Sequence, residues 1–138
     1  MNRKTSLVIG LISVMLLAQC ETGPEPPSVQ QISGNWLLRS AQRNFKRTNT
    51  LEGAVFVFSE NGSMQSNLPL YNTPEMWQAA FVIDQDSLRQ TGALGNMVYQ
   101  IKNWTDSTLT LAFSARGIPF ELNLYRVDSL PRPASLQE

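Results

Sequence analysis

The last third of the chain repeats large apolar side chains with a period of two residues. The repeat covers residues 97–102, 108–113 and 120–125, and short polar turns separate these three segments. Successive side chains of a β-strand point to opposite faces of a sheet, so this period is typical of a strand with one buried face. Antiparallel sheets commonly bury one face and leave the other in water. The pattern therefore predicts an antiparallel β-sheet as the framework of the fold.

Shorter segments of strand character precede this stretch. Glu60-Asn61-Gly62 lies between two of them and is a strong signal for a tight hairpin. No long amphipathic helix separates these segments, which are residues 32–38, 54–58, 63–68, 77–83 and 88–91. Together with the three later strands, they predict an all-β fold, an antiparallel up-and-down β-barrel of about eight strands.

The N-terminus has the layout of an export signal. Asn2-Arg3-Lys4 is followed by an apolar run from Leu7 to Leu17, which is too short to span a bilayer. Leu17-Ala18-Gln19-Cys20 then resembles the lipobox of bacterial lipoproteins, with Gln19 where a small residue is usual. The resemblance implies that residues 1–19 are a cleaved signal peptide and that Cys20 is lipidated. Two or more acyl chains give a stable membrane anchor.

The anchor implies a location and a domain order. We expect a lipid-anchored protein of the bacterial cell envelope, at the outer membrane, on its periplasmic or surface face. Residues 20–31 contain Pro24, Pro26 and Pro27 and are predicted to be a semi-rigid tether. Residues 32–128 have the size of one small barrel domain, and residues 129–138 are predicted to be a flexible tail.

Composition argues against several functions. Removal of residues 1–19 takes away Arg3 and Lys4, which leaves a slight excess of acidic side chains and argues against nucleic-acid binding. The sequence has no histidine and a single cysteine, so histidine-based catalysis, histidine metal sites and an internal disulfide are excluded. We expect no enzyme activity, metal or cofactor. A hydrolase that uses two carboxylates remains the open alternative.

One residue breaks the expected pattern of the last strand. Arg126 shares the parity of the apolar residues before it, so its side chain starts from the core face. A buried guanidinium needs a partner, and Trp36 is the predicted one, with carbonyls of the first strand as further acceptors. The alternative is that the strand turns outward at Tyr125 and leaves Arg126 in water.

Gly34-Asn35-Trp36 and Arg126 together resemble the signature of the lipocalins. In that family a Gly-x-Trp motif begins the first strand, and an arginine at the end of the last strand packs on the tryptophan. The resemblance covers nearly all of residues 32–128. It implies barrel closure by Gly34, Trp36 and Arg126. An eight-stranded barrel can hold one small ligand or can be filled by its own side chains.

Three functions follow from this fold. The first is binding of a small hydrophobic or amphipathic ligand inside the barrel, and the wall candidates are Phe56, Phe58, Met64, Trp77, Phe81, Tyr99 and Phe113. Each of these residues can equally be core filling. The second is a non-catalytic accessory role, in which a filled barrel binds an envelope protein through its exterior or through residues 68–77. The third, an enzyme, has little support.

Four basic residues allow two interpretations. Arg39, Arg43, Lys46 and Arg47 lie within one polar stretch. Charged runs are usually solvated faces, so we favour a solvated strand end and loop. The alternative is the rim of a site for an anionic head group or an anionic lipid.

Overall fold

The computed structural model describes residues 25–69, 76–92 and 95–131. The predicted signal peptide and Cys20 lie outside the described residues. So do residues 70–75 of the predicted partner-binding loop and most of the predicted tail. No helix within the described ranges is long and apolar enough to cross a membrane.

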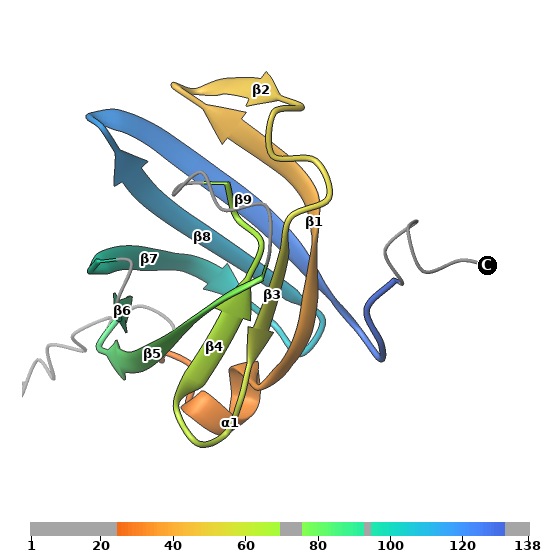
Figure 1. The fold of residues 1–138 in the computed structure, drawn as a ribbon, viewed down its shortest axis with the longest axis vertical. Helices are drawn as coiled ribbons and strands as arrows, with labels where there is room; N and C mark the ends of the chain where they lie inside the picture. Colours follow the sequence, from red (N-terminus) through yellow and green to blue (C-terminus); the bar gives the residue numbers. More distant parts are fainter. Residues whose placement is uncertain (1–24, 70–75, 93–94, 132–138) are drawn as a thin grey trace, which may run out of the picture.

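The described residues form nine strands and one short helix (Figure 1). The helix α1 covers Val29–Ile32. The strands are β1 (Gly34–Arg43), β2 (Lys46–Thr48), β3 (Val55–Phe58), β4 (Ser63–Ser66), β5 (Trp77–Asp84), β6 (Ser87–Thr91), β7 (Met97–Trp104), β8 (Thr108–Ala115) and β9 (Ile118–Val127). All pairings are antiparallel and follow the order β2-β1-β3-β4-β5-β6-β7-β8-β9, with a further pairing of β1 with β9. This pairing closes eight strands into a barrel and confirms the predicted fold, while β2 extends the end of β1.

The predicted hairpin at Glu60-Asn61-Gly62 joins β3 to β4, with Phe58 opposite Met64. Gly62 has a φ of +83°, which favours glycine. The Asn61 side chain accepts hydrogen bonds from the backbone N–H (3.0 Å) and the hydroxyl (2.7 Å) of Ser63. The turn is therefore fixed by its own side chains.

A β-bulge in β1 keeps side chains on both sides of it directed into the core. Trp36 and Ala41 are an odd number of residues apart, yet both are buried. The register with β9 shifts between Leu38 and Ser40, and this extra residue returns the side chains to the inner face. Simple alternation along the strand does not predict this change.

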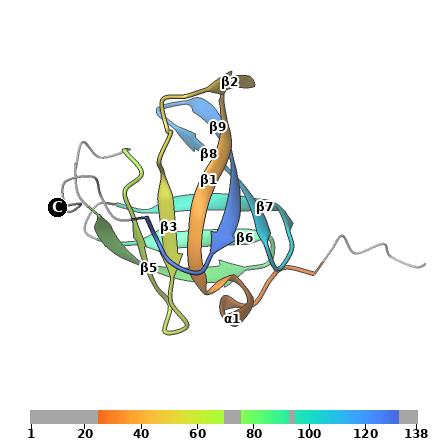
Figure 2. The ribbon, with the colours of Figure 1, turned by 90° about the vertical axis from the view of Figure 1, so that its right-hand side faces the viewer.

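The chain before β1 covers one end of the barrel. Ser28 caps α1 in a capping box with Gln31, and Ile32 is buried. The indole N–H of Trp104 donates to the Glu25 carbonyl at 2.9 Å. Residues 25–31 of the predicted tether are therefore held against the barrel. The helix α1 and strand β2 lie at opposite ends of the molecule (Figure 2).

The described core is self-contained. Its buried side chains and the hydrogen bonds that join the two ends of the sheet all come from residues 25–131. A unit with its own core and a closed sheet can fold independently. Residues 21–138, which contain this unit, are therefore suitable for solution experiments.

Candidate functional site

Arg126 and Trp36 meet at the end of the barrel that α1 covers. They lie opposite each other in the β1–β9 pair, and Cζ of Arg126 is 4.4 Å from the centre of the Trp36 ring. Trp36 is fully buried, and its indole N–H donates to the Ile32 carbonyl at 2.8 Å. A cation over an indole face gains about 0.5–2 kcal/mol, depending on its desolvation. Because β9 continues to Val127, it does not turn outward at Tyr125.

The guanidinium also joins separate segments of the chain. It donates to the carbonyls of Gln31 and Ser33, which lie just before β1. Its Nε donates to the Asp106 carbonyl, in the turn between β7 and β8, at 2.7 Å. We expected acceptors within the first strand, predicted as residues 32–38. Ser33 lies in that range, although the strand itself begins at Gly34, and Gln31 lies before it. Arg126 therefore links three segments and closes this end of the barrel.

Gly34 is required by the position of Arg126. Its φ is +135°, a conformation that residues with a side chain rarely adopt. A Cβ atom at this position would lie only 2.6 Å from Nη1 of Arg126. The Gly-x-Trp motif thus provides space for the guanidinium as well as a buried ring for it to cover.

The seven predicted wall residues form the core of the barrel. Each has at most 5% of its surface exposed. Their rings contact one another, with centroid distances of 5.2 Å for Phe58 and Phe81 and 5.4 Å for Tyr99 and Phe113. The Tyr99 hydroxyl donates to Oε1 of the buried Gln90 at 2.7 Å. These side chains therefore fill the interior at the positions where we expected a ligand.

Trp77 has a structural role in this core. Its indole N–H donates to the carbonyl of the buried Leu68 at 3.1 Å. An exposed Trp77 would favour a partner-binding surface on residues 68–77, whereas Trp77 is 5% exposed. Trp77 therefore cannot contribute to an exposed cluster there, although Met76 beside it is partly exposed.

A groove opens where β7 and β8 separate. Their register runs from Trp104 opposite Leu109 to Gln100 opposite Ala112. Beyond that point the two strands diverge, as Figure 1 shows. Val98 continues beside Arg89 of β6, and Ser114 continues beside Pro119 of β9. The barrel wall is therefore split along part of its length.

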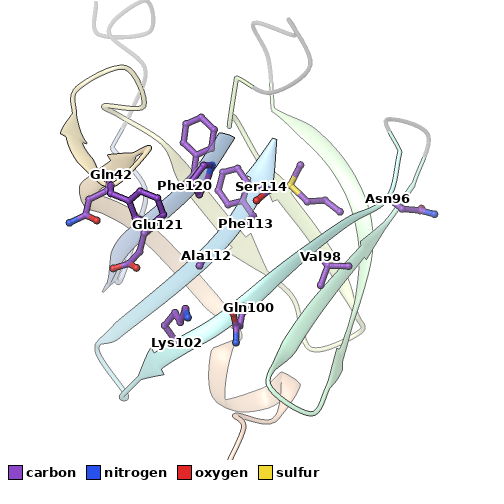
Figure 3. Close-up of a pocket in the computed structure, with 13 residues that line it drawn as sticks. Gln42, Asn96, Val98, Gln100, Lys102, Ala112, Phe113, Ser114, Phe120 and Glu121 are labelled. Atoms are coloured by element: carbon purple, nitrogen blue, oxygen red, sulfur yellow. The ribbon is translucent and has the colours of Figure 1, made fainter. Parts of the chain in front are cut away.

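The groove between the diverging strands has a volume of about 620 Å³. Most of its lining residues are outward-facing residues of β1, β7, β8 and β9, and the full set is Gln42, Phe45, Asn96, Met97, Val98, Gln100, Lys102, Ala112, Phe113, Ser114, Pro119, Phe120 and Glu121. Figure 3 shows Ala112 near its centre, Gln42 and Glu121 on one side, and Val98 and Asn96 on the other. Phe113 is the member of the seven predicted wall residues that lines it.

Aromatic side chains supply the apolar part of the groove. Phe113 and Phe120 are stacked, with centroids 5.1 Å apart and an angle of 7° between the ring planes. Val98 adds an apolar surface that is 51% exposed. Amide and charged side chains lie around them, so the groove has an amphipathic lining.

Sequence reasoning did not predict the groove. The two-residue period places Gln100, Lys102 and Glu121 on the outer face, where polar side chains are ordinarily solvated. The signals that were available are weak: Val98 is an apolar residue on that polar face, and Pro119 lies inside a strand. Within residues 25–69, 76–92 and 95–131, no group of three acidic, histidine or cysteine side chains could hold a metal ion.

Comparison with known proteins identifies a fold. The sequence matches no model of a known protein family, and it matches no curated protein. The structure is similar to a lipocalin-like protein from Bacteroides uniformis, with a TM-score of 0.54 and 11% identity over 70% of this chain and 99% of that one. It is also similar to an uncharacterized protein from Bacteroides eggerthii, with a TM-score of 0.53 and 13% identity over 69% and 98% of the two chains. At this identity the likeness shows the lipocalin-like fold alone.

Proposed function

We propose that this protein is a membrane-anchored lipoprotein of the bacterial cell envelope, and that its barrel binds a small amphipathic ligand in the groove between β7 and β8. The lipobox that ends at Cys20 supports the anchor. The lipocalin-like barrel is a fold of ligand-binding type. The observation that carries the binding role is the groove, because both apolar and polar side chains line it.

The size and chemistry of the groove favour it over the barrel interior. Small-molecule sites usually have volumes of roughly 300–1,000 Å³ and combine apolar walls with a few polar groups, and the groove has about 620 Å³. A ligand in the interior would have to displace packed rings such as Phe58 and Tyr99. Loss of one such core ring costs about 3–5 kcal/mol. In the groove, a ligand can contact the half-buried Phe120, which is stacked on Phe113, without that cost.

A matched pair of variants tests the site. Ala112 lies near the centre of the groove, whereas Ala80 is exposed on β5 and does not line it. Residues 21–138 are purified from a bacterial envelope, and their mass is measured under native and denaturing conditions. We expect a bound small molecule in the parent protein and in Ala80→Trp, but not in Ala112→Trp. If Ala80→Trp and Ala112→Trp retain the small molecule equally, the groove is not the site. The groove is also refuted if the parent protein carries no small molecule and binds no added amphiphile with a dodecyl chain.

The second candidate is a partner protein that adds an extended segment to the split wall. The Pro119 carbonyl accepts a hydrogen bond from the Asn44 N–H at 2.8 Å, so it faces away from β8. In an antiparallel pair, two directly opposite residues either both point their N–H and carbonyl groups toward each other or both point them away from each other. The N–H and carbonyl of Ser114, opposite Pro119, therefore point toward the gap.

Amide exchange distinguishes the two candidates. An added strand would hydrogen-bond the Ser114 amide and slow its exchange with solvent. A small amphiphile on the rings of Phe113 and Phe120 would leave that amide unbonded. Protection of Ser114 by envelope proteins, without protection by amphiphiles, would favour the partner over the small ligand.

A further inference from the structure

Positive charge gathers around the groove. The described residues carry eight basic and eight acidic side chains. We count a side chain as near the groove if its residue lines the groove, or is next to a lining residue in the sequence or opposite one in the sheet. Among the acidic residues described, Glu121 alone meets this criterion. Five basic ones do so, and these are Arg43, Lys46, Arg47, Arg89 and Lys102.

These cations are largely uncompensated. Arg89 is 3.5 Å from Asp84 and has an acidic partner. Within the part of the chain that the structure describes, no ion pair involves the other four. Clefts lined by one sign of charge raise the local concentration of ligands of the opposite sign. The groove should therefore discriminate between ligands by charge.

The β1–β2 hairpin brings an exposed aromatic residue beside these charges. Phe45 lines the groove, yet 81% of its surface is exposed. Asn44 and Phe45 form the turn with φ values of 50° and 65°, a region in which a bulky side chain is strained. Such strain, with little burial in return, is typical of residues that have a binding role. Arg43 and Lys46 flank this turn on either side.

We infer that the groove binds an anionic amphiphile, whose carboxylate, sulfate or phosphate head group lies near the cations of the β1–β2 hairpin while its apolar chain lies on Phe113, Phe120 and Phe45. This inference rests on the proposed function and specifies its ligand class. The hairpin cations are exposed, so their attraction is screened by salt.

A series of head groups on one alkyl chain tests the inference. Residues 21–138 are titrated with dodecanoate, dodecyl phosphate, dodecyl maltoside and dodecyltrimethylammonium below their micelle concentrations, at low and high salt. We expect the two anionic probes to bind about tenfold more tightly than the others at low salt, and the difference to shrink as salt is added. Inorganic phosphate alone should bind far more weakly than dodecyl phosphate.

The outcomes separate the inference from the function on which it rests. Equal binding of all head groups, or tighter binding of the cationic probe, would overturn the charge selection and leave the groove as an amphiphile site. Binding of inorganic phosphate as tight as that of dodecyl phosphate would overturn the role of the apolar side chains. Failure of every amphiphile to bind would overturn the proposed function as well.

A pair of charge reversals locates the head group. Lys46 is next to Phe45, whereas Arg39, also exposed, lies over the Tyr125 ring at 5.2 Å and does not line the groove. Lys46→Glu should weaken dodecanoate binding about fivefold or more and leave dodecyl maltoside binding unchanged. Arg39→Glu should change both by less than about twofold. Equal losses in the two variants would overturn the assignment to the hairpin.

Discussion

The position of Gly34 against Arg126 predicts a specific coupling between two substitutions. Gly34→Ala places a methyl group where the guanidinium lies. Both atoms that a Cβ would meet within 4 Å belong to Arg126, and the nearer is Nη1 at 2.6 Å. Arg126→Ala removes them both. The cost of Gly34→Ala should therefore depend on which residue stands at position 126.

The structure gives the expected magnitudes. Alanine at a φ of +135° is strained, at a cost of about 1–3 kcal/mol in any background. In the parent protein the guanidinium must also move away from the Ser33 carbonyl. Loss of that partly exposed, charge-assisted hydrogen bond adds about 1–2 kcal/mol. We therefore expect Gly34→Ala to cost about 2–5 kcal/mol alone and about 1–2 kcal/mol less in the Arg126→Ala background.

Urea unfolding of residues 21–138 measures these values. The free energy of unfolding is determined for the parent, the two single variants and the double variant, and circular dichroism of the sheet follows the transition. Unfolding slopes should agree among the four proteins, so that the changes reflect stability alone. Strictly additive costs would show that Gly34 is needed only for its backbone conformation, and our reasoning about the guanidinium would be wrong.

Three further predictions concern the anchor, the core and the closed end. Cys20→Ser should prevent incorporation of labelled fatty acid in cells, and normal labelling would contradict the proposed anchor. Phe56→Ala should cost about 3–5 kcal/mol of unfolding free energy, since Phe56 is fully buried and packs against Tyr99 at 6.1 Å; a change below 1 kcal/mol would mean that the interior is not packed as described. Trp104→Phe removes the hydrogen bond to the Glu25 carbonyl, so limited proteolysis near residue 25 should become faster while the midpoint of global unfolding changes little.

Eight of the nine described strands could be predicted because each depends on local sequence, whereas β2, which pairs with the end of β1, was not predicted. Side-chain parity placed Trp77 and Phe81 on the inner face of one strand and Leu109 and Leu111 on that of another, and all four are buried. The same parity turned Arg126 inward, toward Trp36. These properties need only the geometry of a strand and the exclusion of apolar side chains from water.

The groove could not be predicted because it depends on where pairing stops. Nothing in residues 97–99 or 113–115 marks the end of the β7–β8 register at Gln100 and Ala112. The register also shifts between Ile101 and Asn103, beside that end, and such a bulge is not visible in the two-residue period. The aromatic residues within the barrel could likewise line a cavity or fill it, and only their mutual contacts show that they fill it.

The hydrogen bond between Trp104 and Glu25 sets how the molecule would stand on a membrane. If Cys20 carries the lipid, only the five residues that follow it, up to Glu25, connect the bilayer surface to the Glu25 carbonyl. An extended chain of that length spans at most about 18 Å. The closed end would then face the anchoring leaflet, and the β1–β2 hairpin at the opposite end would project into the aqueous compartment. The cations of that hairpin would then lie at the end away from the lipids beneath the protein, so an anionic head group would reach them from the aqueous side.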